Sequence, residues 1–94
     1  MLPPNVAGLQ MPRYFFHVHD GERMPDYTGT ELPDLLAAKH KAVQISGKLL
    51  SERPEVFWTG EEWSLDCCDP TDLVLFTLNF VAAMAPATRS IKNK

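Results

Sequence analysis

The sequence predicts a small α+β domain in which one amphipathic helix packs on one face of a short antiparallel sheet. Apolar residues recur at alternating steps of three and four from about Pro33 to Arg53, which is the period of a helix. On both sides of that segment, aromatic and β-branched residues alternate with polar ones, which is the period of a strand. The expected order of elements is therefore β-β-α-β-β, with a short second strand.

The first strand is expected from Arg13 to His19, where aromatic and β-branched residues dominate and the pair Asp20-Gly21 then favours a hairpin turn. Successive side chains of a strand point to opposite faces of its sheet. The alternation assigns Tyr14, Phe16 and Val18 to the core face, and Phe15, His17 and His19 to the opposite face.

The return from this turn is expected to be short. Glu22 to Met24 can form an edge strand, because Pro25 lacks the N–H group that an interior strand would need. Asp26 to Thr30 then predicts a loop, in which Gly29 is suited to a positive φ angle that other residues resist.

The helix is bounded by residues that start and stop helices. Pro33 suits the first turn, Asp34 complements the positive end of the helix dipole, and Pro54 ends the helix at Arg53. Gly47 weakens the helix interior and is expected to allow close packing against the sheet. The apolar stripe that should face the sheet comprises Leu35, Ala38, Ala42, Ile45 and Leu49, widened by Leu36, Val43 and Leu50.

A loop and a hairpin complete the expected domain. Glu55 to Gly60 has no clean period and predicts a connecting loop that tucks its aromatic residues under the helix end. A strand at about Glu62 to Cys68 and another from Leu73 to about Val81 flank Asp69-Pro70, which favours a type I turn between them. The inward side chains of the last strand should be Val74, Phe76, Leu78 and Phe80.

The second face of the sheet carries more apolar residues than a solvated face needs. Phe15, Leu75 and Val81 point there, yet a single helix covers only one face. The most economical cover is another copy of the chain, so we expect a homodimer, or another protein partner, through this face. The interface candidates are Phe15, His17, Leu75 and Thr77.

Composition and charge predict one folded, cytoplasmic domain. The 94 residues are 45% hydrophobic and 22% charged, which is ordinary globular usage. A net charge of −3 supplies no basic field, so nucleic-acid binding is not expected. The apolar stretch from Leu73 to Ala85 is too short for a membrane span, and Met1 to Gln10 lacks the form of a secretory signal. We expect a flexible leader at 1–11, the domain at 12–82 and a flexible tail at 83–94.

His17 and His19 are the most suggestive pair for chemistry. A His-x-His step on a strand projects both imidazoles from one face, about 6 to 7 Å apart, where they could converge on a metal ion. No third histidine or cysteine pair lies at a spacing typical of metal sites. The favoured interpretation is therefore that these histidines belong to a polar sheet face or are buried in an interface. Cys67 and Cys68 are adjacent and should point to opposite faces, which argues against a disulfide between them.

No set of residues predicts a catalytic site or a cofactor. The carboxylates cluster around the expected hairpins and the start of the helix, where turns and helix N-termini favour them in any case. No serine lies in a nucleophile motif, no base is placed near a cysteine, and the glycines are scattered singly. A non-catalytic protein is therefore favoured over an enzyme.

Several motifs together resemble a known family. They are PRYFFH at residues 12–17, DG at 20–21, GTELPDL at 29–35 followed by Ala37-Ala38, and VLF at 74–76. They resemble a family of short bacterial proteins classified as a domain of unknown function, over about residues 12–81, and they support a start at Met11. The resemblance implies no activity and no site residue. A more distant, fold-level likeness is to HicB-type antitoxins, whose partial RNase-H-like domain also opens with a short aromatic strand, a glycine turn and a helix.

Three functions follow, in order of preference. The first is a non-catalytic protein-interaction or self-associating module, because of the apolar residues on the second sheet face. The second is a small-ligand or metal-binding protein that uses His17 and His19. The third is an antitoxin-like regulatory protein, which the distant likeness implies.

Overall fold

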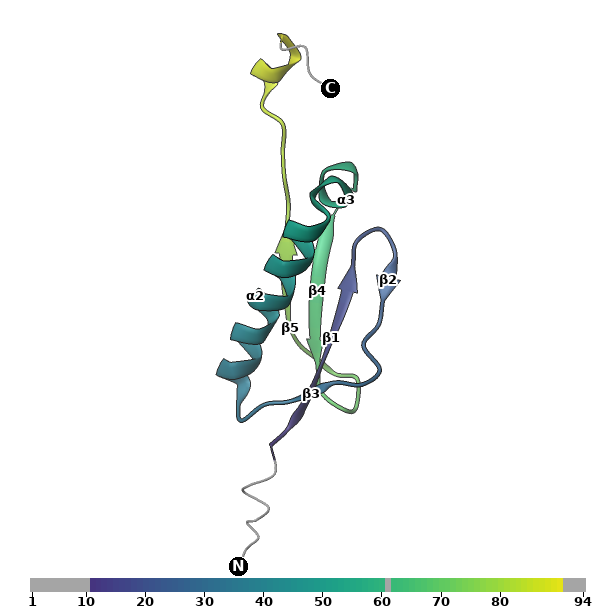
Figure 1. Cartoon of the computed structure of the whole chain (residues 1–94), viewed down its shortest axis with the longest axis vertical. Coiled ribbons are helices and arrows are strands. Elements are labelled where there is room, and N and C mark those ends of the chain that lie inside the picture. Colours follow the sequence, from purple (N-terminus) through teal and green to yellow (C-terminus); the bar gives the residue numbers. More distant parts are fainter. Residues whose placement is uncertain (1–10, 61, 91–94) are drawn as a thin grey trace, which may run out of the picture.

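A computed structural model describes residues 11–60 and 62–90, and it confirms the α+β class (Figure 1). The sheet has the order β2-β1-β4-β5, with β3 also paired to β1, and all pairings are antiparallel. The long helix lies across one face of this sheet. The elements are β1 (Arg13–His19), β2 (Arg23–Met24), β3 (Thr30–Glu31), α2 (Leu35–Glu52), α3 (Pro54–Thr59), β4 (Trp63–Cys68), β5 (Val74–Phe80) and the 3-10 helix η1 (Pro86–Ser90).

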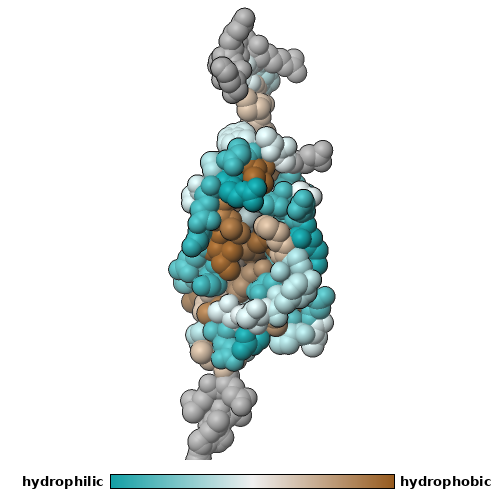
Figure 2. All heavy atoms as spheres, turned by 45° about the vertical axis from the view of Figure 1, so that its right-hand side comes forward, coloured by the Kyte–Doolittle hydropathy of each residue, from teal (hydrophilic) through white to brown (hydrophobic). Residues whose placement is uncertain are grey.

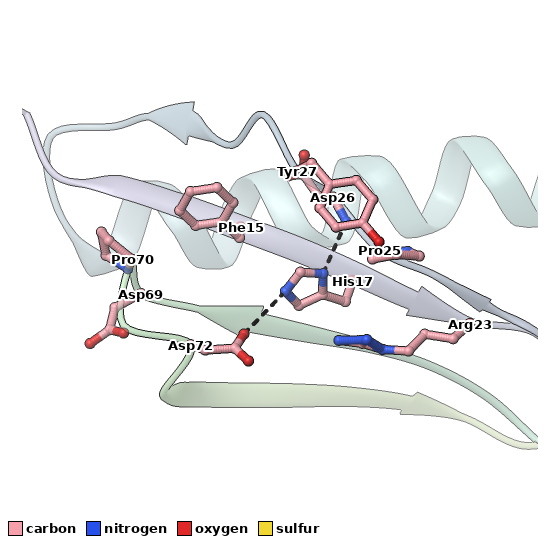
Figure 3. Close-up of a pocket in the computed structure, with 9 residues that line it drawn as sticks. All are labelled: Phe15, His17, Arg23, Pro25, Asp26, Tyr27, Asp69, Pro70 and Asp72. Atoms are coloured by element: carbon pink, nitrogen blue, oxygen red, sulfur yellow. Dashed lines mark hydrogen bonds and ion pairs between the residues drawn. The ribbon is translucent and has the colours of Figure 1, made fainter.

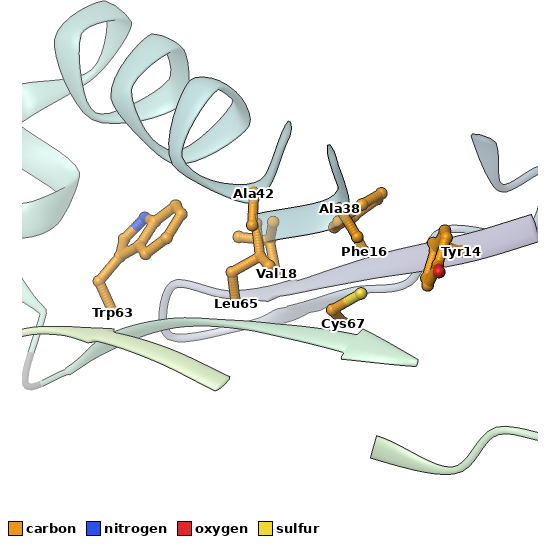
Figure 4. Packing of buried hydrophobic residues seen from close by; sticks show 8 residues of the cluster. All are labelled: Tyr14, Phe16, Val18, Ala38, Ala42, Trp63, Leu65 and Cys67. Atoms are coloured by element: carbon orange, nitrogen blue, oxygen red, sulfur yellow. The ribbon is translucent and has the colours of Figure 1, made fainter. Parts of the chain in front are cut away.

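The core forms where the predicted alternation placed it. The side chains on one face of β1 and β4 are buried under α2, and Figure 4 shows them pointing toward the helix. Burying large apolar side chains of this kind stabilises a domain by roughly 1.5–3 kcal/mol each. The cluster is Tyr14, Phe16, Val18, Ala38, Ala42, Trp63, Leu65 and Cys67.

The helix begins and ends close to the predicted residues, with one correction at its start. Asp34 is the N-cap, and its carboxylate accepts a hydrogen bond from the N–H of Ala37 at 2.9 Å. Pro33 therefore precedes the cap and does not lie in the first turn as predicted. Arg53 is the C-cap, as expected from the Pro54 that follows it.

Small residues make the closest contact between the helix and the sheet. Ala38, Ala42 and Ser46 are fully buried, whereas Leu36 and Val43, predicted to widen the buried stripe, are 60% and 58% exposed. Leu35 is also exposed, at 42%. Gly47 is exposed, and a Cβ atom there would have nothing within 4 Å, so this glycine does not provide the predicted close packing. A narrow line of small side chains lets α2 approach the sheet, with Ile45, Leu49 and Leu50 partly buried against the core and Leu36 and Val43 left exposed.

The segment predicted as a loop after the helix forms a second helix, α3. Pro54 occupies the first helical turn and Glu55 follows it there, which suits a helix N-terminus. Val56 and Phe57 are partly buried, but Trp58 is 61% exposed and meets Phe57 edge-on at 5.7 Å between ring centroids. The prediction that this segment tucks its aromatic residues under the helix end is therefore wrong for Trp58.

The hairpin of β4 and β5 is confirmed, but its register shifts near the turn. Trp63 pairs with Phe80 and Cys67 with Phe76, after which Cys68 pairs with Val74. Because of the irregularity between Cys67 and Cys68, Val74 pairs with Cys68, which follows the last core residue of β4. Val74 is 50% exposed instead of buried as predicted.

The expected loop after β2 contains a third short strand. Thr30 and Glu31 pair with Tyr14 and Arg13, and the Arg13 guanidinium lies 2.9 Å from the Glu31 carboxylate. The loop between β2 and β3 thus starts and ends on the same edge of β1, and it contacts the sheet face opposite α2 through Asp26, which bonds His17, and Gly29, which lies against Phe15.

The surface on the β2 side of the molecule has an apolar hollow. Seen with that side turned forward, apolar residues gather in a hollow between hydrophilic rims (Figure 2). In the described part of the chain, no helix combines the length and apolar character that a membrane crossing requires. The predicted leader lies mostly outside the described residues, and the segment predicted as a tail includes η1.

Candidate functional site

A cavity of about 340 Å³ opens on the sheet face opposite α2. Phe15 and His17 of β1 form its floor, the segment from Arg23 to Tyr27 forms one wall, and the turn between β4 and β5 forms another (Figure 3). Three separate stretches of sequence therefore meet around two neighbouring side chains of one strand.

His17 is the buried polar group of this cavity. The residue is 7% exposed, and its Nδ1 accepts a hydrogen bond from the backbone N–H of Asp26 at 3.0 Å. Its Nε2 lies 3.7 Å from Oδ1 of Asp72, which is longer than a hydrogen bond. Among the described residues the imidazole thus has one hydrogen bond, from Asp26, and a longer ion-pair contact with Asp72 on its other side (Figure 3).

The bond from Asp26 decides which nitrogen of His17 carries a proton. An Nδ1 that accepts a hydrogen bond has no hydrogen of its own, so the neutral ring carries its hydrogen on Nε2. Nε2–H then faces the cavity as a donor. A metal-binding histidine usually has the reverse arrangement, in which the nitrogen away from the metal donates.

Asp26 shapes the wall of the cavity through its side chain. Its carboxylate accepts hydrogen bonds from the N–H groups of Phe16, Thr28 and Gly29, at 3.2, 3.0 and 3.0 Å. Burial on its own would raise the pKa of Asp26, but these three bonds and the nearby His17 lower it below the ordinary value of 3.8. The same residue therefore folds the loop onto β1 and orients His17.

The turn between β4 and β5 is held in a similar way. The Asp69 carboxylate accepts from the hydroxyl and N–H of Thr71 and from the N–H of Leu73, and the bond from the Thr71 hydroxyl is the main cause that lowers the pKa of Asp69. Asp72 follows with a φ of 72°, a conformation that aspartate tolerates better than most residues. Of the three aspartates at the cavity, only Asp72 keeps its carboxylate free of a hydrogen bond among the described residues.

A mixed set of metal-ligand types converges beside His17. One ligand atom each of His17, Cys68 and Asp72 lies within 4.8 Å of the others. Burial raises the pKa of the Cys68 thiol, and the carboxylates of Asp72 and Asp66 raise it further. A neutral thiol and an Nε2–H donor are both in the wrong protonation state to bind a metal without losing a proton.

His19, the predicted partner of His17, does not belong to this group. Its Nε2 lies 3.4 Å from Oδ2 of Asp66, whose other carboxylate oxygen accepts a hydrogen bond of 2.7 Å from the Thr77 hydroxyl. Cys68 and Asp72 were not predicted, because a turn and a register shift, neither visible as a motif, bring them to His17. The one local signal was the Asp-Pro turn that separates them.

The four predicted interface residues fall into two regions. Phe15 and His17 line the cavity on β1, whereas Leu75 and Thr77 lie on β5, with β4 between the two strands. Leu75 is 38% exposed and Thr77 is exposed. Any partner that covers Leu75 and Thr77 therefore meets the edge strand of the sheet.

A family model for a domain of unknown function, DUF6894, matches residues 13–81. The chain belongs to this family. The DUF6894 match begins at the first residue of β1 and ends one residue beyond β5, so it contains both the cavity and the edge strand. Neither the comparison with curated proteins nor the comparison with solved structures found a match.

Proposed function

We propose that this DUF6894 domain is a non-catalytic module that self-associates through the free edge of β5. The observation that carries the proposal is the character of that edge. No described strand pairs with its outer side, and the sequence from Leu73 to Thr88 contains no charged residue. A long, uncharged strand edge is a template for pairing with another strand, which proteins usually protect with charges, prolines or bulges.

The opposite edge of the sheet has such protection. Its outer strand, β2, is two residues long, carries the exposed Arg23 and is followed by Pro25. The contrast between the two edges supports the proposal that β5, and not β2, is the edge that pairs.

The cover over β5 is also incomplete on the helix side. Phe76, Leu78 and Phe80 face that side, but all three are only partly buried. On α2, the exposed Leu36 and Val43 lie about 100° to 120° around the helix from the line of small buried residues. The helix packs on the sheet beside β4, the neighbour of β5 (Figure 1), so the side chains that a partner strand places on the helix side of the sheet would extend this apolar surface beyond β5.

A second copy of the chain is the occupant that suits this edge. β5 offers backbone groups and apolar side chains without charge, and an identical strand meets these requirements without repulsion. Antiparallel pairing centred on Thr77 sets Phe76 opposite Leu78 of the second copy and Leu75 opposite Asn79 of the second copy, so each residue meets one from its own face. The predicted interface residues Leu75 and Thr77 then lie at the centre.

Sedimentation velocity on the full chain tests the proposal. We expect a dimer for the wild-type protein and a monomer for the double variant Thr77→Lys, Asn79→Lys, because lysines on facing edge strands repel. Both positions are exposed, so the monomer should stay folded. Met24→Lys is the matched control, since it adds a lysine to the opposite edge and should leave the dimer intact. A wild-type protein that stays monomeric at every attainable concentration would contradict the proposal.

A pair of helix variants tests the contribution of α2. Val43→Glu places a charge on the exposed apolar line, and Gln44→Glu places it one residue later, on the side of the helix that faces away from the sheet. We expect the first to weaken the dimer and the second to leave the dissociation constant unchanged. Equal effects of the two variants would mean that the helix line takes no part.

The other predicted functions have less support. Metal binding by His17 is favoured by the nearby Cys68 and Asp72 but opposed by the hydrogen bond that Nδ1 accepts. Metal binding that also involves His19 stays a prediction. The antitoxin-like role also stays a prediction, and no contact among the described residues supports it.

A further inference from the structure

We infer that the cavity above His17 binds a small planar ligand through an amide-like edge, meaning a carbonyl oxygen beside an N–H group. This inference is independent of self-association, because the cavity lies on β1 and the loops around it, whereas the proposed dimer uses β5. It rests on two polar groups and on the rings that stand around them in a cavity wall that also carries charged side chains.

The first polar group is Nε2–H of His17. The side chain is only 9% exposed, and its other nitrogen is committed to the Asp26 N–H, so the ring cannot turn away without breaking that bond. Among the described residues Nε2 has no hydrogen-bond acceptor within bonding distance, since its nearest carboxylate oxygen lies at 3.7 Å. A donor that is fixed in direction and almost buried gains most from an acceptor supplied by a ligand.

The second polar group is the carboxylate of Asp72. The Nε2 to Oδ1 distance of 3.7 Å is too long for the two groups to bond each other well. It suits two partners that sit side by side on one ligand edge, with the carbonyl oxygen toward His17 and the N–H toward Asp72. The side chain of Asp72 is 79% exposed, so it can adjust to the ligand.

The rings in the cavity wall favour a flat ligand body behind that edge. The Phe15 and Tyr27 rings and the rings of Pro25 and Pro70 surround the two polar groups in Figure 3. Tyr27 is 87% exposed, which is unusual for an aromatic residue and leaves its ring free to cover a ligand. Most binding cavities combine apolar walls with a few oriented polar groups in the same manner.

The arrangement discriminates against two other ligand classes. A carboxylate ligand would be attracted by Arg23, but the cavity lining also carries the carboxylates of Asp26, Asp69 and Asp72, whose like charges outnumber this one cation. A metal ion would need an unprotonated Nε2, and the ring hydrogen would then move to Nδ1 and oppose the N–H of Asp26. An uncharged ligand with adjacent acceptor and donor satisfies both groups without either cost.

Two-dimensional NMR of the 15N-labelled full chain with nicotinamide as the probe tests the inference. We expect saturable shifts centred on Phe15, His17 and Tyr27, and weak affinity in about the millimolar range for so small a molecule. The nitrogen spectrum of His17 should keep the hydrogen on Nε2 in the complex. Benzoate, which has the ring and the oxygens but no N–H donor, should bind at least about tenfold more weakly.

The matched variants are Asp72→Gly and Glu22→Gln. Glycine adopts the positive φ of residue 72 readily, so the first variant removes the acceptor without straining the turn. It should weaken nicotinamide binding about tenfold. Glu22→Gln removes a negative charge outside the cavity lining and should leave the affinity unchanged.

Three outcomes would overturn the inference. The first is the absence of saturable shifts around His17 with nicotinamide. The second is tighter binding of benzoate than of nicotinamide, which would make the cavity an anion site. The third is zinc binding that shifts His17 and Asp72 and displaces nicotinamide, which would make it a metal site. The Thr77→Lys, Asn79→Lys variant should bind nicotinamide as the wild type does, so failure here and failure of self-association are distinguishable.

Discussion

Gly29 lies where the loop before β3 passes close to side chains of β1. Its φ is +77°, and a Cβ atom there would lie 2.8 Å from both Cγ of Arg13 and Cε2 of Phe15. An alanine at this position would suffer both backbone strain and a steric clash. The glycine is therefore required by the loop that forms the wall of the cavity.

We expect Gly29→Ala to lower the free energy of unfolding by about 2–4 kcal/mol. Gly21→Ala is the control, because Gly21 also has a positive φ, of +99°, but has nothing within 4 Å of its Cβ position. The control should lose only about 1 kcal/mol from backbone strain. Urea unfolding measures both variants, and equal losses would show that the contact with β1 is unimportant.

Ser46, in contrast to Gly29, is a residue that lowers the stability of the fold. It is fully buried in the middle of α2, and its hydroxyl is the one buried side-chain polar atom in the described part of the chain that lacks a hydrogen bond. An unsatisfied buried hydroxyl destabilises a protein, and serine is also a weaker helix former than alanine.

We expect Ser46→Ala to raise the free energy of unfolding by about 1 kcal/mol. Ser51→Ala, five residues later in the same helix, removes an exposed hydroxyl that donates to the carbonyl of Lys48 at 3.0 Å, and should change stability by less than about 0.5 kcal/mol. Chemical denaturation of the two variants side by side checks the difference. A loss of stability in Ser46→Ala would mean that the hydroxyl has a role that its surroundings do not reveal.

In the loop between β2 and β3, a side-chain carboxylate, not a neighbouring strand, accepts the backbone hydrogen bonds. Asp26 accepts three backbone N–H groups that no strand partner satisfies, and this is why its pKa is lowered in the folded state. The unfolded chain then binds a proton at Asp26 before the folded one does. The resulting stabilisation is complete above the ordinary pKa of 3.8 and is lost as the pH falls below it toward the folded pKa.

Asp26→Asn should therefore change both stability and its dependence on pH. At neutral pH we expect a loss of about 2 kcal/mol, because an amide offers one acceptor oxygen where three N–H groups need two. Between pH 5 and about pH 3 the variant should lose less stability than the wild type, since it has no proton to gain at this position. Thermal unfolding across that range checks it, and parallel pH profiles would contradict the assignment.

In the helices, the local sequence pattern predicted the position of α2, but packing decided which of its side chains are buried. The period of three and four located α2 correctly, but it could not tell which of several apolar residues would face the sheet. The small side chains of Ala38, Ala42 and Ser46 are the fully buried ones, because they allow the closest approach of helix to sheet, while the predicted Ile45 and Leu49 are only partly buried against the core. The six residues of α3 were missed because so short a helix shows less than two turns of any period.

For the molecule as a whole, self-association should couple to stability. If folded monomers pair through β5, raising the protein concentration favours the folded dimer, so the melting temperature should rise with concentration. The Thr77→Lys, Asn79→Lys variant should show no such dependence. Differential scanning calorimetry over a wide range of concentration measures it, and a melting temperature that stays constant in the wild type would count against the dimer.

Local patterns in the sequence were enough to predict the fold class and most of the strands. The alternation of Tyr14, Phe16 and Val18 with polar or half-buried neighbours placed the core face correctly, and Asp20-Gly21 and Asp69-Pro70 marked the turns. Strand period, helix period and turn chemistry each depend on a few consecutive residues, so they can be read without knowing the rest of the fold.

The candidate site and the open edge, in contrast, depend on tertiary contacts. The register between β1 and β4, together with the shift at Cys68, brings Asp72 to within 3.7 Å of His17, and the loop carrying Asp26 fixes the His17 ring from the other side. The place of β5 at the end of the sheet likewise follows from the order of the strands. Such contacts join residues that are distant in sequence, and no local period records which strand pairs with which or in what register.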